Sequence, residues 1–188
     1  GAVGDVLLNS EQPARLRRAA ARALAKIGKG SVGPHVPILL KALADEDHSV
    51  ALTVGQALAG IGKPAVAPLG DALKSDSARA RRFAAFGLAK MGEDAAGATP
   101  ALVAALSDKS ETVRANACEA LGKVGAQKAV AALVDRLDDS SGVVQIAAAD
   151  ALRTLAPKDK KVQAALQKHT RKIAAAGKVS PAPEWRYD

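Results

Sequence analysis

The chain has 188 residues, of which 48% are hydrophobic but only 2% are aromatic. Small aliphatic residues must therefore build the core, and such a core favours closely packed helices over strands. The formal net charge of +8 makes nucleic acid a partner class to consider. A single cysteine, Cys118, excludes an intrachain disulfide, and no apolar run is long enough to span a membrane.

A short phrase, Leu-x-x-apolar-Gly, recurs along the chain and organises it. Its copies end at Gly28, Gly62, Gly92 and Gly125, and a degenerate fifth copy ends at Ala156. The intervals of 34, 30, 33 and 31 residues fall in the range of repeats made of two helices. The period predicts an all-α fold, a right-handed α-α superhelix or solenoid of about five helical hairpins.

Each repeat is expected to open with a first helix that ends at its anchor residue. Apolar residues lie one, four, five, eight and twelve positions before the anchor, which is the spacing of one helix face. Fifteen positions before the anchor stand short polar residues that predict N-caps: Asp47, Ser77, Ser110 and Ser141. The anchor glycines Gly28, Gly62, Gly92 and Gly125 suit the left-handed position just past a helix end.

A shorter second helix is expected after each anchor, ending on Leu43, Leu73, Leu106 or Leu137. A polar or acidic turn follows each second helix at once, so the repeats adjoin without linkers. The predicted limits are a partial repeat over 1–10, repeats over 11–44, 45–74, 75–107, 108–138 and 139–177, and a tail over 178–188.

The two ends of the array are expected to differ. Residues 3–8 have the pattern of the last turns of a second helix whose first helix is missing from the given sequence, a pattern that fits an array continuing upstream in a longer protein. Residues 159–176 predict a final amphipathic helix with one apolar stripe and many Lys and Arg opposite, which suits a solenoid end that faces water. Residues 157–188 carry +5 of the net charge, and Trp185 and Tyr187 lie in the tail.

The phrase from Asp108 to Gly125 resembles the HEAT-like repeat of phycobilin lyases, and the resemblance extends over about residues 3–166. In that family an Asp before the first helix and an Arg early in it form a ladder from repeat to repeat. The full pair here is Asp108 with Arg114. The second and fifth repeats have Ala51 and Gln145 in place of the Arg, so an interrupted ladder is expected.

No motif predicts a reaction centre. The phosphate-loop-like Gly28-x-Gly30-x-x-Gly33 follows a predicted helix where a dinucleotide site needs a strand, so an inter-helix loop is expected. His35, His48 and His169 lack the spacing of zinc ligands or paired iron ligands. The acidic runs at 45–47 and 138–139 recur at one repeat position, which favours capping over acid-base catalysis. We therefore expect no enzyme, metal or cofactor.

Two surfaces are candidates for binding. One is a concave groove on the second helices, with small or weakly charged outward residues: Ile38, Lys41, Pro68, Asp71, Ala101, Ala104, Ala132 and Asp135. The other is a basic face on the first helices: Arg15, Arg17, Arg18, Arg22, Arg79, Arg81 and Arg82. A solvated surface with some of these Arg paired to acids of neighbouring repeats is the alternative for the basic face.

We predict that the chain is a scaffold, or the repeat module of a larger protein, and that it binds a protein or peptide partner in the concave groove. Two alternatives stay open at this point. One is binding to a nucleic-acid backbone through the Arg and Lys faces. The other is a bilin lyase or isomerase subunit, which only the resemblance implies. Partner identity, cellular compartment and oligomeric state do not follow from the sequence.

Overall fold

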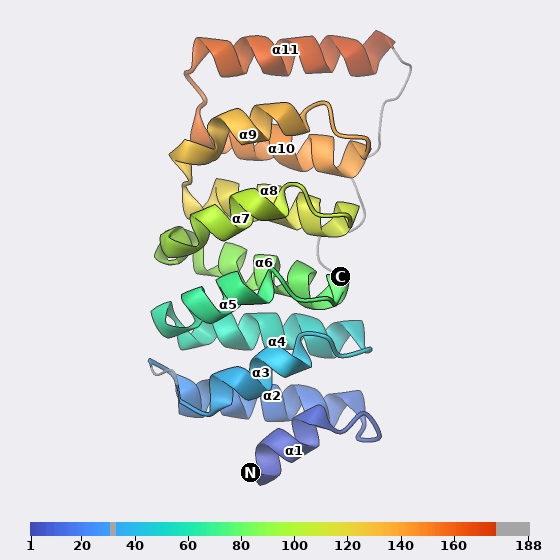
Figure 1. Ribbon diagram of the computed structural model, residues 1–188, viewed down its shortest axis with the longest axis vertical. Coiled ribbons are helices and arrows are strands. Elements are labelled where there is room, and N and C mark those ends of the chain that lie inside the picture. The colour runs from blue at the N-terminus through green and yellow to red at the C-terminus, as the bar shows by residue number, and fades with distance from the viewer. Residues whose placement is uncertain (31–32, 176–188) are drawn as a thin grey trace.

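The computed structural model describes residues 1–30 and 33–175, and it confirms an all-α solenoid whose helices stack along one long axis (Figure 1). The first-helix row comprises α2 (Ala14–Gly28), α4 (His48–Ile61), α6 (Ala78–Met91), α8 (Glu111–Val124) and α10 (Gly142–Leu155). The second-helix row comprises α1 (Ala2–Leu8), α3 (His35–Ala42), α5 (Val66–Ala72), α7 (Thr99–Ala105) and α9 (Val130–Arg136). The described residues contain no strand.

The first helices begin where the sequence places their caps. The Asp47 carboxylate accepts hydrogen bonds from the backbone N–H groups of Ser49 and Val50, and the Ser77 hydroxyl accepts one from Ala80. Ser110 and Ser141 are also N-cap residues, although their side chains make no capping bond. The predicted cap positions are confirmed at all four helices.

Three of the four anchor glycines end their helices as predicted. Gly62, Gly92 and Gly125 have φ values of 88°, 57° and 76°, a region that a Cβ would strain. The prediction for Gly28 is wrong because α2 continues through it and the positive φ of 78° falls on Gly30. The N–H of Gly30 donates to the carbonyl of Ile61, so a bond to the next repeat sets this turn.

The core lies mainly within the first-helix row. Helices α6 and α8 each bury nine of their 14 residues, whereas α7 buries two of seven and α9 buries one of seven. Small residues let neighbouring first helices approach closely. A Cβ added to Gly87 would lie 3.2 Å from the carbonyl oxygen of Gly55, so α6 and α4 are almost in backbone contact.

The C-terminal end is covered by α11 (Lys160–Ala175), close to the predicted 159–176 (Figure 1). Val162 and His169 are buried on its inner stripe, and the Lys172 ammonium lies 2.6 Å from the Asp138 carboxylate. The tail over 178–188, with Trp185 and Tyr187, lies outside the described residues. Among the described helices, none is both long and apolar enough to cross a bilayer.

Candidate functional site

A ladder of buried ion pairs connects successive repeats. Each guanidinium binds the next repeat's carboxylate through Nε and Nη2, at 2.6–2.9 Å. The rungs are Arg17 with Asp45, Arg81 with Asp108, and Arg114 with Asp139. Because two parallel bonds fix both distance and orientation, each rung sets how one repeat sits on the next. We call these pairs the Arg–Asp ladder.

Each rung also organises backbone around it. Nη1 of Arg81 donates to the carbonyl oxygens of Ser75 and Asp76, in the turn before its own helix. The Asp108 carboxylate accepts the N–H of Ser110, the N-cap of α8. A rung therefore joins one turn, one helix start and the junction between two repeats.

The ladder is interrupted between α4 and α6, as the sequence predicts. The positions that would hold the Arg and the Asp are occupied by Ala51 and Ser75. At this junction close packing takes the place of the ion pair. A Cβ added to Gly55 of α4 would lie 3.1 Å from the Phe83 carbonyl oxygen of α6 and 3.1 Å from the Phe86 ring.

The ladder corrects the expected basic face. Arg17 and Arg81 are buried in rungs, so neither can reach a phosphate. Arg18 donates to the Ser49 hydroxyl and Arg79 to the Asp45 carbonyl, while Arg82 lies 5.2 Å from the centroid of the Phe83 ring. Arg15 and Arg22 remain exposed on α2. Most of the predicted face is thus occupied in holding repeats together.

The electrostatics of the ladder follow from its hydrogen bonds. Burial acts to raise the pKa of the Asp108 carboxyl, but hydrogen bonds from Arg81 and the Ser110 N–H outweigh burial, so the pKa lies below its ordinary value. Burial also acts to raise the pKa of the Asp139 carboxyl, but hydrogen bonds from Arg114 and the Ser141 N–H outweigh it, so this pKa too lies below its ordinary value. Both carboxylates therefore stay ionised in mildly acidic solution.

The lowered pKa values of Asp108 and Asp139 predict that the folded chain loses stability in acid. A carboxyl whose pKa is depressed by folding contributes stability above its unfolded pKa of about 3.9, and loses it as pH falls through the folded pKa. The difference in free energy of unfolding between the unmodified chain and Asp108→Asn should therefore be largest near pH 7 and shrink below about pH 4. Urea titrations at several pH values measure it. A difference that does not change with pH would contradict the assigned role.

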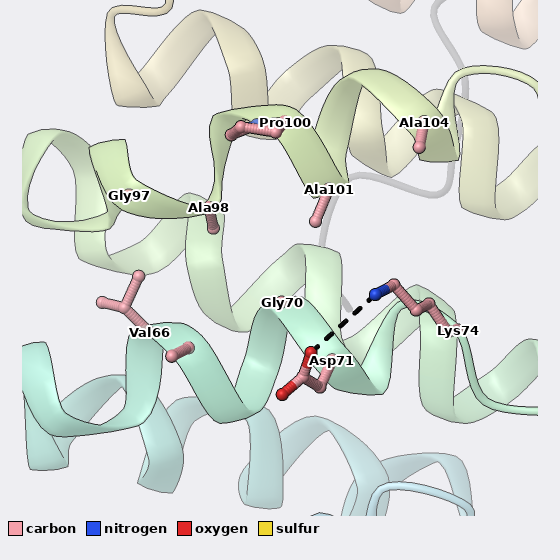
Figure 2. A pocket seen from close by; sticks show the side chains of 10 residues that line it. Val66, Gly70, Asp71, Lys74, Gly97, Ala98, Pro100, Ala101 and Ala104 are labelled. Carbon is pink, nitrogen blue, oxygen red and sulfur yellow. Dashed lines mark ion pairs between the residues drawn. The ribbon is translucent and has the colours of Figure 1, made fainter.

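The second-helix row contains a depression of about 410 Å³ between α5 and α7 (Figure 2). Of the predicted groove residues, Asp71, Ala101 and Ala104 line it. Pro68 lies on α5 without lining it, and the other four lie on α3 and α9: Ile38, Lys41, Ala132 and Asp135. The structure therefore gathers only three of the eight predicted residues into one hollow.

The depression has an apolar floor and a charged edge. Val66, Gly70, Ala98 and Ala101 offer small surfaces, and Figure 2 shows Asp71 and Lys74 together at one side. Their charged atoms are 4.0 Å apart and both side chains are well exposed. A second hollow of about 510 Å³ shares Gly97 and Pro100 with it and extends toward Lys128. Small and apolar residues make up most of the lining of both hollows.

The residue types that most often carry chemistry are dispersed or buried. The histidines lie on separate helices, and burial is the main cause that lowers the pKa of His48 and of His169. Burial also raises the pKa of the Cys118 thiol to about 12, so the thiol stays protonated. In residues 1–30 and 33–175, no group of three or more His, Cys, Asp or Glu could hold a metal ion.

The motif-like segments have structural roles where they are described. Helix α2 precedes and includes Gly28, so the glycine-rich segment follows a helix, and its residues 31–32 lie outside the described part. In the acidic runs, Asp45 and Asp139 belong to the ladder and Asp47 caps α4. Asp138 pairs with Lys172. These carboxylates are used in packing and capping.

Solved structures with the same architecture include a complex of CpcE and CpcF of phycocyanin lyase from Nostoc sp. PCC7120. That match has a TM-score of 0.63 at 21% identity, covering 79% of this chain and 91% of that chain. A designed armadillo repeat protein in complex with the peptide (KR)4 matches with TM-score 0.52 and 22% identity over 98% of this chain and 94% of that one. Human deoxyhypusine hydroxylase matches with TM-score 0.53 and 24% identity over 83% and 73%.

No curated protein sequence matches the chain. At 21–24% identity, these three solved structures show that the chain shares their fold. Residues 3–82 and 66–153, however, match HEAT repeats directly in sequence, and these two segments overlap to cover most of the chain. With the stacked hairpins and the Arg–Asp ladder described above, this match establishes that the chain belongs to the HEAT repeat family.

Proposed function

We propose that the chain is a non-enzymatic scaffold that binds a polypeptide partner along the second-helix row, centred on the depression between α5 and α7. The observation that carries the proposal is this hollow, which has an apolar floor formed by residues of both helices. The designed armadillo repeat protein, a similar solenoid, is in complex with a peptide, which supports a peptide as the kind of partner.

The geometry suits an extended or helical segment that places an apolar side chain on the floor. Ala98 and Ala101 leave space there because they are small, and the burial of one such side chain contributes about 1.5–3 kcal/mol. Asp71 and Lys74, which lie together at one edge of the hollow, would then contact polar groups of the partner at that edge. Two charges of opposite sign favour a partner of mixed charge over a phosphate backbone.

Affinity capture with the chain as bait tests the proposal. Ala104→Glu adds a charge at an exposed edge of the hollow, and Ala101→Glu adds one on its floor. Both should remove partner capture, whereas Ala164→Glu, an exposed alanine on α11, should leave it unchanged. Capture that survives both substitutions in the hollow, with melting temperatures unchanged, would exclude this surface.

The two other interpretations of the sequence have weaker support. Backbone binding to nucleic acid needs a track of free cations, and the ladder removes Arg17 and Arg81 from that track. The bilin lyase or isomerase interpretation rests on similarity to the phycocyanin lyase complex, and at 21% identity that similarity is one of fold. Neither is part of the proposal.

A further inference from the structure

Helix α11 buries fewer residues than the first helix before it. Of its 16 residues only Val162 and His169 are buried, whereas α10 buries seven of 14. Ala165 and Leu166 are partly buried against the core, on the same side of α11. We call these four residues the inner stripe of α11. Because a segment with few buried contacts opens at a low cost in free energy, α11 should open more readily than α10.

Among the described residues, no ladder rung ties α11 to the repeat before it. Gln145 of α10 stands in the place of the ladder arginine, and it donates to the Asp139 carbonyl of its own repeat. The ion pair at this junction joins Lys172 of α11 to Asp138, and the two side chains are 64% and 65% exposed. Such an exposed pair adds little stability. The docking of α11 therefore depends mainly on its inner stripe.

The inner stripe contains one titratable side chain, His169, which is only 7% exposed. The Nδ1 atom of its ring is buried and has no hydrogen-bond partner among the described residues. The ring is hydrogen-bonded to the backbone of Leu137, at the end of α9. In a neutral imidazole one nitrogen donates and the other only accepts. An unprotonated Nδ1 therefore leaves just a lone pair unused in the docked helix.

Protonation of His169 would change the balance between docked and released α11. It would turn Nδ1 into a second donor and place a positive charge inside the junction. Because Nδ1 has no partner there, the new N–H would be buried without a hydrogen bond, which is costly. In a released helix the same N–H would be hydrated. The neutral ring thus favours docking and the charged ring favours release.

The groups around the ring act in both directions. Burial is the largest cause that lowers the pKa of His169, and the charges of Lys172 on the same helix and Arg153 on α10 add to the lowering. Asp138, after α9, and the Leu137 backbone act to raise the pKa but do not outweigh the other causes. The pKa in the docked helix is therefore below its ordinary value of about 6.5.

This lowered pKa links the docking of α11 to pH. Well above pH 6.5 the ring is neutral in both states, and docking has its full strength. As pH falls below about 6.5, the released helix binds a proton that the docked helix does not, so release becomes easier. The docking equilibrium constant falls by up to about tenfold per pH unit, until the pH reaches the pKa of the docked ring.

We propose that α11 is a pH-sensitive latch, which stays docked on α9 and α10 while the His169 imidazole is neutral and is released when Nδ1 takes up a proton. Release uncovers the inner stripe and the part of the fifth repeat that it contacts. The junction of α8 and α10 stays closed, because the last rung of the ladder and the close approach of Gly122 to Ala151 hold it. The latch does not depend on the proposed peptide site, which lies between α5 and α7.

Amide hydrogen exchange, followed by NMR between pH 7 and pH 5, tests the latch. A free helix of 16 residues is marginal in water, so the amides of a released α11 lose protection. In the unmodified chain the protection factors of α11 should fall by at least about threefold over this range, while those of α8 stay constant. The ring resonances of His169, recorded in the same samples, should titrate over the pH range in which α11 loses protection.

Two substitutions separate titration from packing. His169→Gln keeps a side-chain N–H for the Leu137 backbone, and His169→Leu fills the site with an apolar group. Neither side chain titrates, so α11 should be equally protected at pH 7 and pH 5 in both variants. The control is His48→Gln, which replaces an exposed histidine whose pKa is also lowered and should leave the pH dependence of α11 unchanged.

Three results would overturn the proposal. One is α11 protection that stays constant in the unmodified chain while the His169 ring titrates, and this result needs no variant. Another is a loss of protection at pH 5 that persists in His169→Gln or His169→Leu, since another group would then be responsible. The third is an equal loss in α8, because the whole chain, and not the latch, would then be opening.

Discussion

Replacing Arg81 with Ala should lower the free energy of unfolding by about 3 kcal/mol, the lower end of the range for a broken buried ion pair. The side chains of Arg81 and Asp108 are only 6% and 10% exposed, so the substitution leaves a carboxylate with little water to replace its partner. It also frees the carbonyl oxygens of Ser75 and Asp76, which Arg81 holds in the turn before α6. Several groups lose their partner at once.

Urea unfolding followed by circular dichroism measures this loss. The control is Arg79→Ala, two residues earlier in α6, whose exposed side chain makes one hydrogen bond to the Asp45 carbonyl. It should cost less than about 1 kcal/mol. Because each repeat of a solenoid contacts mainly its neighbours, Arg81→Ala should also broaden or split the transition. Equal losses for the two variants would mean that the rung is not a specific stabilising contact.

Replacing Gly87 with Leu should destabilise the chain by about 3 kcal/mol, the upper end of the range for overpacking. A Cβ alone would lie 3.2 Å from the Gly55 carbonyl oxygen and 3.3 Å from the Leu69 side chain. The backbone oxygen cannot move without displacing α4, so the added side chain must push α4 and α6 apart. This is the junction where Ala51 and Ser75 interrupt the ladder, so close packing is what remains to hold it.

Gly60→Leu is the matched control for this overpacking. Gly60 is also within a first helix, but a Cβ there meets no atom within 4 Å. The substitution should stabilise the chain slightly, by up to about 1 kcal/mol, because leucine has the better helix propensity. Thermal melts of both variants compare the two sites directly. If Gly87→Leu were as stable as Gly60→Leu, the inferred close contact of α4 and α6 would be incorrect.

Functional residues were harder to anticipate than helices. The apolar period and the residues at 47, 77, 110 and 141 predicted where helices start, because capping acts within a few residues. The fate of the arginines depended on partners 25–28 residues away. Arg17 and Arg81 look like surface cations in the sequence, and the signal that could have placed them was the recurrence of an acid at the start of the following repeat.

The helical hairpins, their number and their stacking into an array could be read from the residues in order. They follow from local helix propensity, from the caps and from a repeated apolar face that one hairpin is too small to bury alone. The burial of particular charges and the position of the hollow in the second-helix row became visible in the folded chain alone. Charge burial and the shape of the second-helix row depend on contacts between repeats. These contacts join side chains that are far apart in the chain, so a local sequence pattern does not predict which side chains meet.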